Sequence, residues 1–312
     1  MSLDPRAKRF LDTLAAMSPP SALSLTVAQR RQGLEQLLGF AGPPEPVATV
    51  RNLSVPGRSG LLLLRLYTPT HSVSAASAAL VYFHGGGLVA GNLDTHDPIC
   101  RSLCNATGCQ IVAVDYRLGP EHPFPAAIED GVDAWRWMAA HTGEFGIDPD
   151  RLGICGDSAG ATLAAVVCQA LAAADARVAV QLLICPITDF AAETESRRSL
   201  AEGYLVDRAT LQHDLKYYLG ADGEAADPRV SPLRAKDLSR LPATIVHTAE
   251  FDPLRDEGQA YANRLESAGV RTIYRCHPGM IHLFYAMAGL LPYARTAYGL
   301  MGDDLRAVFA AR

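Results

Sequence analysis

From residue 47 onward, short apolar runs alternate with longer stretches in which apolar residues recur at helical spacing. Short uninterrupted runs are typical of strands buried on both faces, and a 3.6-residue repeat is typical of amphipathic helices. The predicted strands are 50–55, 61–68, 79–83, 109–117, 151–155, 179–187, 242–249 and 271–276. The predicted helices are 129–141, 158–173, 254–268 and 288–310. This alternation predicts an α/β fold, with a mostly parallel central sheet flanked by helices on both faces.

The first 46 residues follow a different pattern. Asp4 and Pro5 form a pair typical of a helix N-cap and first turn, and a second helix is predicted to begin at Thr26. The stretch "GPPEP" at 42–46 then ends the segment. We therefore expect residues 1–46 to be distinct from a main domain that spans residues 47–312.

A second irregularity lies between residues 190 and 240. This interval is long and mixed in composition, and helical periodicity is visible only around residues 207–219. Because the interval breaks the alternation of strands and helices, we interpret it as an insertion above the sheet.

Charge and hydropathy exclude several classes of partner. The formal net charge is −5, which argues against nucleic acid or an anionic membrane as the main partner. The opening "MSLDPRAKRFLDTL" has no apolar core typical of a secretory signal. The longest uncharged run, 158–174, is too short and too polar to span a bilayer. We expect a cytoplasmic protein.

The seven cysteines show neither disulfide nor zinc-ligand spacing. Their number is odd, no Cys-x-x-Cys occurs, and most of them have apolar neighbours. Reduced, packed thiols are therefore expected, and we expect no metal site and no cofactor.

The stretch "GDSAG" at 156–160 carries the strongest chemical signal. It follows a predicted strand and precedes a predicted helix, which is the setting of the G-x-S-x-G nucleophile elbow. Flanking glycines remove the Cβ atoms that such a tight turn would crowd. Ser158 is the candidate nucleophile, and the Ala159 amide at the start of the helix would face it. A plain strand-to-helix turn is the alternative interpretation.

A second glycine-rich loop, "HGGG" at 84–87, also directly follows a strand. Bare backbone amides there could join Ala159 in an oxyanion hole. The alternative is a dinucleotide fingerprint formed by Gly85, Gly87 and Ala90, with Asp115 at the end of the next strand. We favour the oxyanion hole for two reasons. The sequence after the loop is a poor start for the helix that would bind a pyrophosphate, and a phosphate site would leave the role of Ser158 unexplained.

An activated serine also needs a base and an acid, which follow it in the order acid then histidine in this type of fold. The loop after the strand at 242–249 offers Glu250 and Asp252, and the loop after the strand at 271–276 offers His277 and His282. Position along these loops favours Asp252 and His282, with Glu250 and His277 as the alternatives.

Five ordered motifs together resemble the hormone-sensitive-lipase-type esterases, or bacterial family IV, of the α/β-hydrolase fold. The motifs are "HGGG", "DYRLGPEHPFPAA" at 115–127, "GDSAG", "DPLRDEG" at 252–258 and "GMIH" at 279–282. The resemblance implies a triad of Ser158, Asp252 and His282, with Gly85, Gly86 and Ala159 as oxyanion donors. It also implies a helical cap formed by residues 1–46 and about 190–235, and a homodimer.

The resemblance implies hydrolysis of small-molecule esters with short- to medium-chain acyl groups. Amide hydrolysis or deacetylation by the same triad stays open, as does the non-catalytic binding role of the related gibberellin receptors, which lack the catalytic histidine. Three positions depart from the family pattern: Ala161 and Leu283 stand where glycine is common, and Gly119 stands where alanine is common. Leu283 directly follows His282, so we expect it to narrow the pocket or to shift the histidine loop.

Overall fold

The computed structural model describes residues 2–71, 76–220 and 223–311, which contain one eight-stranded sheet. The strands lie side by side in the order β1-β2-β4-β3-β5-β6-β7-β8. Their bounds are β1 Thr49–Gly57, β2 Gly60–Thr68, β3 Ser77–Phe83, β4 Gln110–Val114, β5 Ile147–Asp157, β6 Val180–Ile184, β7 Ala243–Phe251 and β8 Thr272–Ile281.

The pairing of the strands agrees with their apolar patterns. β1 and β2 form an antiparallel hairpin, and β2 also pairs antiparallel with β4, whereas the pairs from β4 through β3 to β8 are parallel. All residues of β3, β4 and β6 are buried, as expected for strands covered on both faces. The predicted α/β-hydrolase architecture with a mostly parallel sheet is confirmed.

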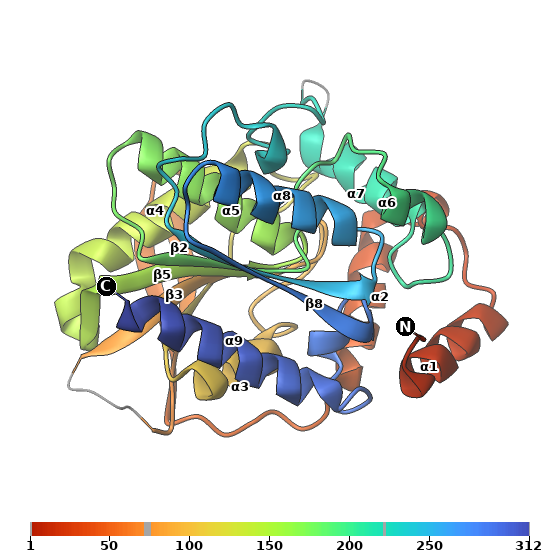
Figure 1. The fold of residues 1–312 in the computed structure, drawn as a ribbon, viewed down its shortest axis with the longest axis horizontal. Coiled ribbons are helices and arrows are strands. Elements are labelled where there is room, and N and C mark those ends of the chain that lie inside the picture. Colours follow the sequence, from red (N-terminus) through yellow and green to blue (C-terminus); the bar gives the residue numbers. More distant parts are fainter. Residues whose placement is uncertain (1, 72–75, 221–222, 312) are drawn as a thin grey trace.

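Helices cover both faces of the sheet (Figure 1). In that view α4 (Ala126–His141), α5 (Ala159–Ala173) and α8 (Arg255–Ser267) lie above the sheet, and α3 (Asp97–Thr107) and α9 (Tyr293–Ala310) lie below it. Each layer closes over its own cluster of buried apolar side chains. The parallel strands thus have their carboxyl ends at one edge, where ligands bind in open α/β sheets.

Four further helices lie at one end of the sheet (Figure 1). They are α1 (Pro5–Ala16), α2 (Val27–Leu38), α6 (Glu195–Ser199) and α7 (Arg208–Leu219). The sequence predicted the start of α1 and α2 correctly: Asp4 accepts hydrogen bonds from the first amides of α1, and Thr26 forms a reciprocal capping box with Gln29.

Some elements differ from the sequence-based expectation. Helix α3 was not predicted, although Pro98 in its first turn and Gly108 after its end are typical helix signals. Helix α9 begins at Tyr293 rather than at 288, because residues 288–290 form a separate turn in which the Leu290 and Leu291 amides donate to the Met287 carbonyl. In the described part of the chain, no helix has the length and apolar character needed to cross a membrane.

Candidate active site

Ser158 occupies a strained turn between β5 and α5. Its backbone angles are φ 52° and ψ −125°, a conformation that side-chain-bearing residues rarely adopt. The turn is tight enough that a Cβ at Gly156 would collide with the Gly160 carbonyl, and one at Gly160 with the Phe83 carbonyl. Glycine is therefore required on both sides, and the serine hydroxyl is held at the carboxyl edge of the sheet.

Three side chains from three strand ends form a hydrogen-bonded chain. His282 Nε2 lies 2.9 Å from Ser158 Oγ, and His282 Nδ1 lies 2.7 Å from Asp252 Oδ2. Asp252 directly follows β7, and His282 directly follows β8. The exposed fractions of Ser158, His282 and Asp252 are 8%, 1% and 0%, so the chain of hydrogen bonds is shielded from water. This geometry suits a base that removes a proton from the serine hydroxyl.

The alternative acid and base are engaged elsewhere. The Glu250 carboxylate accepts a hydrogen bond of 2.7 Å from the Gly279 amide, and His277 lies 2.9 Å from His247 on the α9 side of the sheet. Burial lowers the pKa of His277 to about 3. The structure therefore brings Asp252 and His282 to Ser158, rather than Glu250 and His277.

The glycine-rich loop after β3 differs in one position from the prediction. The Gly85 amide donates a hydrogen bond of 2.9 Å to Asp157 Oδ1, so it is not free to bind a substrate oxygen. Gly86 and Gly87, in contrast, line the same cavity as Ser158. The prediction of Gly85 as an oxyanion donor does not fit this geometry, because sequence spacing cannot show which amide a distant carboxylate occupies.

Asp157 is a residue whose importance the sequence analysis missed. Its buried carboxylate accepts hydrogen bonds from the Gly85 amide, from Tyr82 Oη and, at 3.0 Å, from Tyr285 Oη. Burial raises the pKa of Asp157, against the effect of these hydrogen-bond donors. The signal in the sequence was only its place beside Ser158. In the structure Asp157 ties the serine turn to the glycine loop.

A small cavity opens directly at Ser158 and His282. It has a volume of about 40 Å³ and is bordered by α2, α7, the glycine loop and Leu283. Leu283 has a positive φ of 60°, and it lines this cavity as a wall next to the histidine. The expectation that Leu283 narrows the pocket thus agrees with its place in the structure. We call this space the inner cavity.

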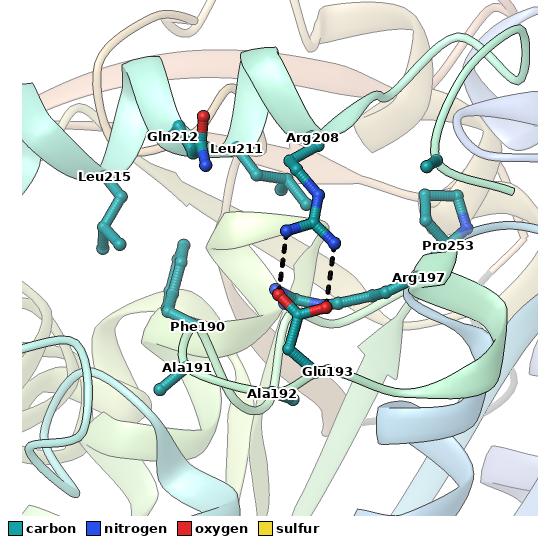
Figure 2. A pocket seen from close by; sticks show the side chains of 11 residues that line it. Phe190, Ala191, Ala192, Glu193, Arg197, Arg208, Leu211, Gln212, Leu215 and Pro253 are labelled. Atoms are coloured by element: carbon teal, nitrogen blue, oxygen red, sulfur yellow. Dashed lines mark hydrogen bonds and ion pairs between the residues drawn. The ribbon is translucent and has the colours of Figure 1, made fainter. Parts of the chain in front are cut away.

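A second cavity, of about 140 Å³, shares lining residues with the inner cavity, and Figure 2 shows the side chains that border it. Phe190 and Leu211 line both spaces, and we interpret their side chains as the partition between them. Arg208, which descends from α7, pairs with Glu193 at 2.8 Å across the larger space. We call this space the outer cavity.

An ion pair between two separate helices borders the inner cavity. Arg30 of α2 donates to both carboxylate oxygens of Asp214 on α7, with a shortest distance of 2.7 Å. The Asp214 carboxylate also lies so close to Gly87 that a Cβ there would collide with it. Gly87 has a φ of 70°, so both space and backbone conformation require glycine.

Comparisons with known proteins show the family of the chain. A family model described as alpha/beta hydrolase fold matches residues 80–286. The chain is 38% identical to an ethyl acetate hydrolase of Pseudomonas putida, over 98% of this chain and 99% of the relative. It is 34% identical to an arylesterase of Saccharolobus solfataricus, over 91% of this chain and 92% of the relative. It also resembles the solved structure of an ester-hydrolase from the metagenome of Lake Arreo in complex with a bipyridine phosphonate derivative. The TM-score is 0.94 and the identity 40%, over 99% of both chains.

Proposed function

The chain belongs to the hormone-sensitive-lipase-type α/β hydrolases and is a serine carboxylesterase, and from this premise we propose that Ser158, His282 and Asp252 are its catalytic triad. The observation that carries the proposal is the continuous hydrogen-bonded chain from Ser158 Oγ through the His282 ring to Asp252. Asp252 is itself fixed by a hydrogen bond of 2.9 Å from the Leu254 amide.

The first half of the reaction transfers the acyl group to the enzyme. Ser158 Oγ attacks the ester carbonyl carbon while its proton passes to His282 Nε2. The carbonyl electron pair moves to the oxygen, and a tetrahedral intermediate forms. When this intermediate collapses, the carbon–oxygen bond to the alcohol breaks and His282 returns the proton to the leaving alkoxide.

The second half releases the acid. Water gives a proton to His282 Nε2 while its oxygen forms a bond to the carbonyl carbon of the acyl-serine. The bond between this carbon and Ser158 Oγ then breaks, the acid leaves, and His282 returns the proton to Ser158 Oγ. Asp252 keeps one proton on Nδ1 of His282, so that Nε2 can accept, and it stabilises the positive charge on the ring.

The negative oxygen of the intermediate needs donors that are already in place. We propose the amides of Gly86, Gly87 and Ala159, because Gly86 and Gly87 border the cavity at Ser158 and Ala159 begins α5 directly after it. Gly85 instead holds the loop through Asp157. Loss of one such donor typically lowers the rate about 100- to 1000-fold.

The two cavities support small esters as substrates. An engineered apolar cavity of about 150 Å³ binds benzene, so the outer cavity of about 140 Å³ suits a ring or a short alkyl chain. The inner cavity of about 40 Å³ has room for only a very small group such as acetyl. We therefore assign short- to medium-chain esters, with the larger apolar part directed past Phe190.

The helices around the cavities support a cap. Arg30 of α2 and Asp214 of α7 come from separate parts of the chain, yet both border the inner cavity. We assign the cap to residues 1–46 and about 190–235. A homodimer and a cytoplasmic location complete the proposal, the first from family resemblance and the second from the sequence.

The direct test is covalent labelling of the nucleophile. A fluorophosphonate should add one adduct to the wild-type protein, at Ser158, and abolish ester hydrolysis. Ser158→Ala should accept no adduct and lose nearly all turnover of p-nitrophenyl acetate, whereas Ser267→Ala, at an exposed helix serine, should behave as the wild type. A Ser158→Ala enzyme that keeps a tenth of the activity would refute the assignment.

A further inference from the structure

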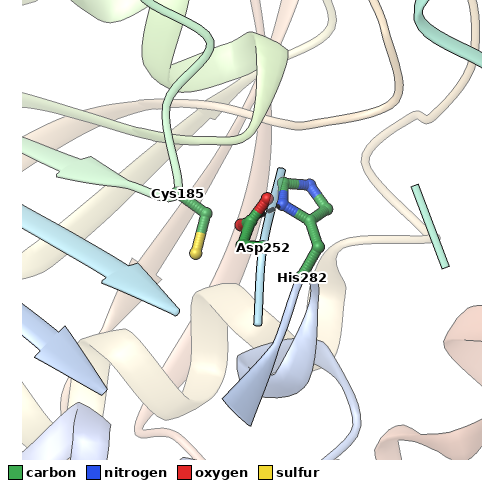
Figure 3. A group of neighbouring side chains, drawn as sticks. All are labelled: Cys185, Asp252 and His282. Carbon is green, nitrogen blue, oxygen red and sulfur yellow. Dashed lines mark hydrogen bonds and ion pairs between the residues drawn. The ribbon is translucent and has the colours of Figure 1, made fainter. Parts of the chain in front are cut away.

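We propose that Cys185, Asp252 and His282 form a binding site for Zn²⁺, and that the bound ion switches the esterase off. The inference rests on the proposed role of His282 as the base, and it concerns a thiol that takes no part in the hydrolytic steps. In the described residues, these three side chains bring their potential ligand atoms within 4.8 Å of one another (Figure 3).

The site is built from the ends of three neighbouring parallel strands. Cys185 directly follows β6, Asp252 follows β7 and His282 follows β8. β6 pairs with β7, and β7 pairs with β8, so their carboxyl ends must lie next to one another. The fold therefore fixes the three ligands without help from a flexible loop.

The backbone holds the Cys185 side chain in this place. Cys185 has a positive φ of 47°, and its amide donates a hydrogen bond of 2.7 Å to the His247 carbonyl on β7. A non-glycine residue in this conformation is strained and persists only when its surroundings fix it. The side chain is completely buried and lies beside the Asp252 carboxylate (Figure 3).

The donor set matches the chemistry of zinc. Thiolate sulfur, imidazole nitrogen and carboxylate oxygen are its usual protein ligands, at about 2.0–2.3 Å. The three potential ligand atoms lie within 4.8 Å of one another, so an ion among them would have to shift these side chains to reach about 2.0–2.3 Å from each. Soft thiolate ligands also select zinc over Mg²⁺ and Ca²⁺, which prefer oxygen.

Binding at this site has a defined chemical consequence. The ion takes the place of the Cys185 thiol proton, which goes to solvent, and of the Nδ1 proton of His282, which moves to Nε2 of the same ring. Nδ1 is the ring nitrogen that faces Asp252, whereas Nε2 faces Ser158. A neutral imidazole with the metal on Nδ1 carries its proton on Nε2, so it can no longer accept the proton of Ser158.

The test measures metal binding and activity separately. Co²⁺ serves as an optical probe, because a cobalt–thiolate bond gives a charge-transfer absorption, and Zn²⁺ serves as the inhibitor of p-nitrophenyl acetate hydrolysis. Cys185→Ser keeps a small hydroxyl in place of the thiol but removes the soft ligand. Cys276→Ala is the matched control, because Cys276 is the exposed cysteine that would explain unspecific inhibition.

We expect one Co²⁺ per chain with the thiolate absorption in the wild type, in Cys276→Ala and in Ser158→Ala, but not in Cys185→Ser. Loss of an outer-shell partner alone lowers metal affinity about 10- to 100-fold, and Cys185 is proposed as a direct ligand. The Zn²⁺ concentration for half inhibition should therefore be at least about tenfold higher in Cys185→Ser than in the wild type. The activity of each variant is expressed relative to the same variant without metal. Chelation should restore activity in the wild type.

Absence of the absorption in the wild type, or equal zinc inhibition in Cys185→Ser and the wild type, would overturn the proposal. Cys185→Ala gives the same comparison should the serine variant fail to fold. The result is independent of the proposed function, because Ser158→Ala reports on metal binding without any hydrolysis.

Discussion

At the scale of single residues, Asp157 connects the two motifs that the reaction requires. Ser158, the proposed nucleophile, directly follows Asp157 in the sequence. The Asp157 carboxylate also accepts a hydrogen bond from the Gly85 amide, which belongs to the glycine loop. A carboxylate has only acceptor atoms when it is ionised, so the three donors that face it all agree with its chemistry. Its position therefore sets the distance between Ser158 and the proposed oxyanion donors.

Asp157→Asn should consequently impair catalysis although no reacting atom is removed. The new amide group would point a donor at Tyr82, Tyr285 or Gly85, and one of these buried groups would lose its partner. We expect kcat to fall by at least about 10-fold, toward the cost of a lost oxyanion donor. Tyr285→Phe, which removes a single donor and introduces no new one, should have a smaller effect. Equal kcat for Asp157→Asn and the wild type would contradict this role.

Phe190 leads to a second prediction at this scale, because we interpret it, together with Leu211, as the partition between the two cavities. Phe190→Ala would join spaces of about 40 and about 140 Å³. We expect the optimum in a series of p-nitrophenyl esters to shift toward longer acyl chains, or the optimum in a series of acetate esters to shift toward larger alcohols. The series that responds identifies the part of the ester in the outer cavity.

The matched control for Phe190→Ala is Leu215→Ala. Leu215 lines only the outer cavity, so its truncation enlarges that space and leaves the partition in place. The substrate profile of this variant should change less. Identical profiles for both variants, or no change in either ester series, would show that Phe190 is not a partition for substrate.

At the scale of elements, α2 and α7 are joined by a buried polar network. Asp214 pairs with Arg30 at 2.7 Å and lies 3.0 Å from His213 Nδ1, while His213 Nε2 lies 3.1 Å from the Leu25 carbonyl. Both ring nitrogens thus face acceptors, and an imidazolium can donate to both. The hydrogen bond to Asp214 is the main cause that raises the pKa of His213 above 6.5.

This shift predicts how stability depends on pH. The folded state holds the His213 proton more tightly than the unfolded state, so its stabilisation is complete below about pH 6.5 and is lost as the pH rises through the higher folded pKa. His213→Gln should therefore cost more free energy of unfolding at about pH 6 than at about pH 9. Urea unfolding of both proteins at the two pH values measures the difference. A cost that grows with pH would contradict the assignment.

Elements also show how far the sequence could lead. Apolar runs located the strands, because burial on both faces leaves few polar positions, and chain order then singled out Asp252 and His282. Helix α3 was missed because "NLDTHDP" reads as a turn, even though Ile99 and Leu103 recur at helical spacing. The bond from Gly85 to Asp157 joins residues 72 positions apart, and the approach of Cys185 to Asp252 depends on strand pairing. Such contacts follow from the assembled sheet and have no local signature.

At the scale of the whole molecule, most of the apolar core lies away from the reacting side chains. Two clusters of buried apolar side chains hold the helices on the two faces of the sheet. The triad and both cavities, in contrast, lie at the carboxyl ends of the strands and beneath α2 and α7. Substitutions deep in a helical layer should therefore change the free energy of unfolding without changing the rate of hydrolysis.

Leu305 and Leu61 offer a matched pair to test this separation. Leu305 in α9 is 1% exposed, and Leu61 in β2 is 77% exposed. Leu305→Ala should lower the free energy of unfolding by about 2–5 kcal/mol, because it removes buried methyl groups and leaves a cavity, whereas Leu61→Ala should change it by less than about 0.5 kcal/mol. Urea unfolding gives these values. At a temperature where both variants are folded, their kcat/KM should stay within about twofold of the wild type, because neither residue borders the inner or the outer cavity. A tenfold loss of kcat/KM in folded Leu305→Ala would mean that the α9 layer positions the triad as well as supporting the fold.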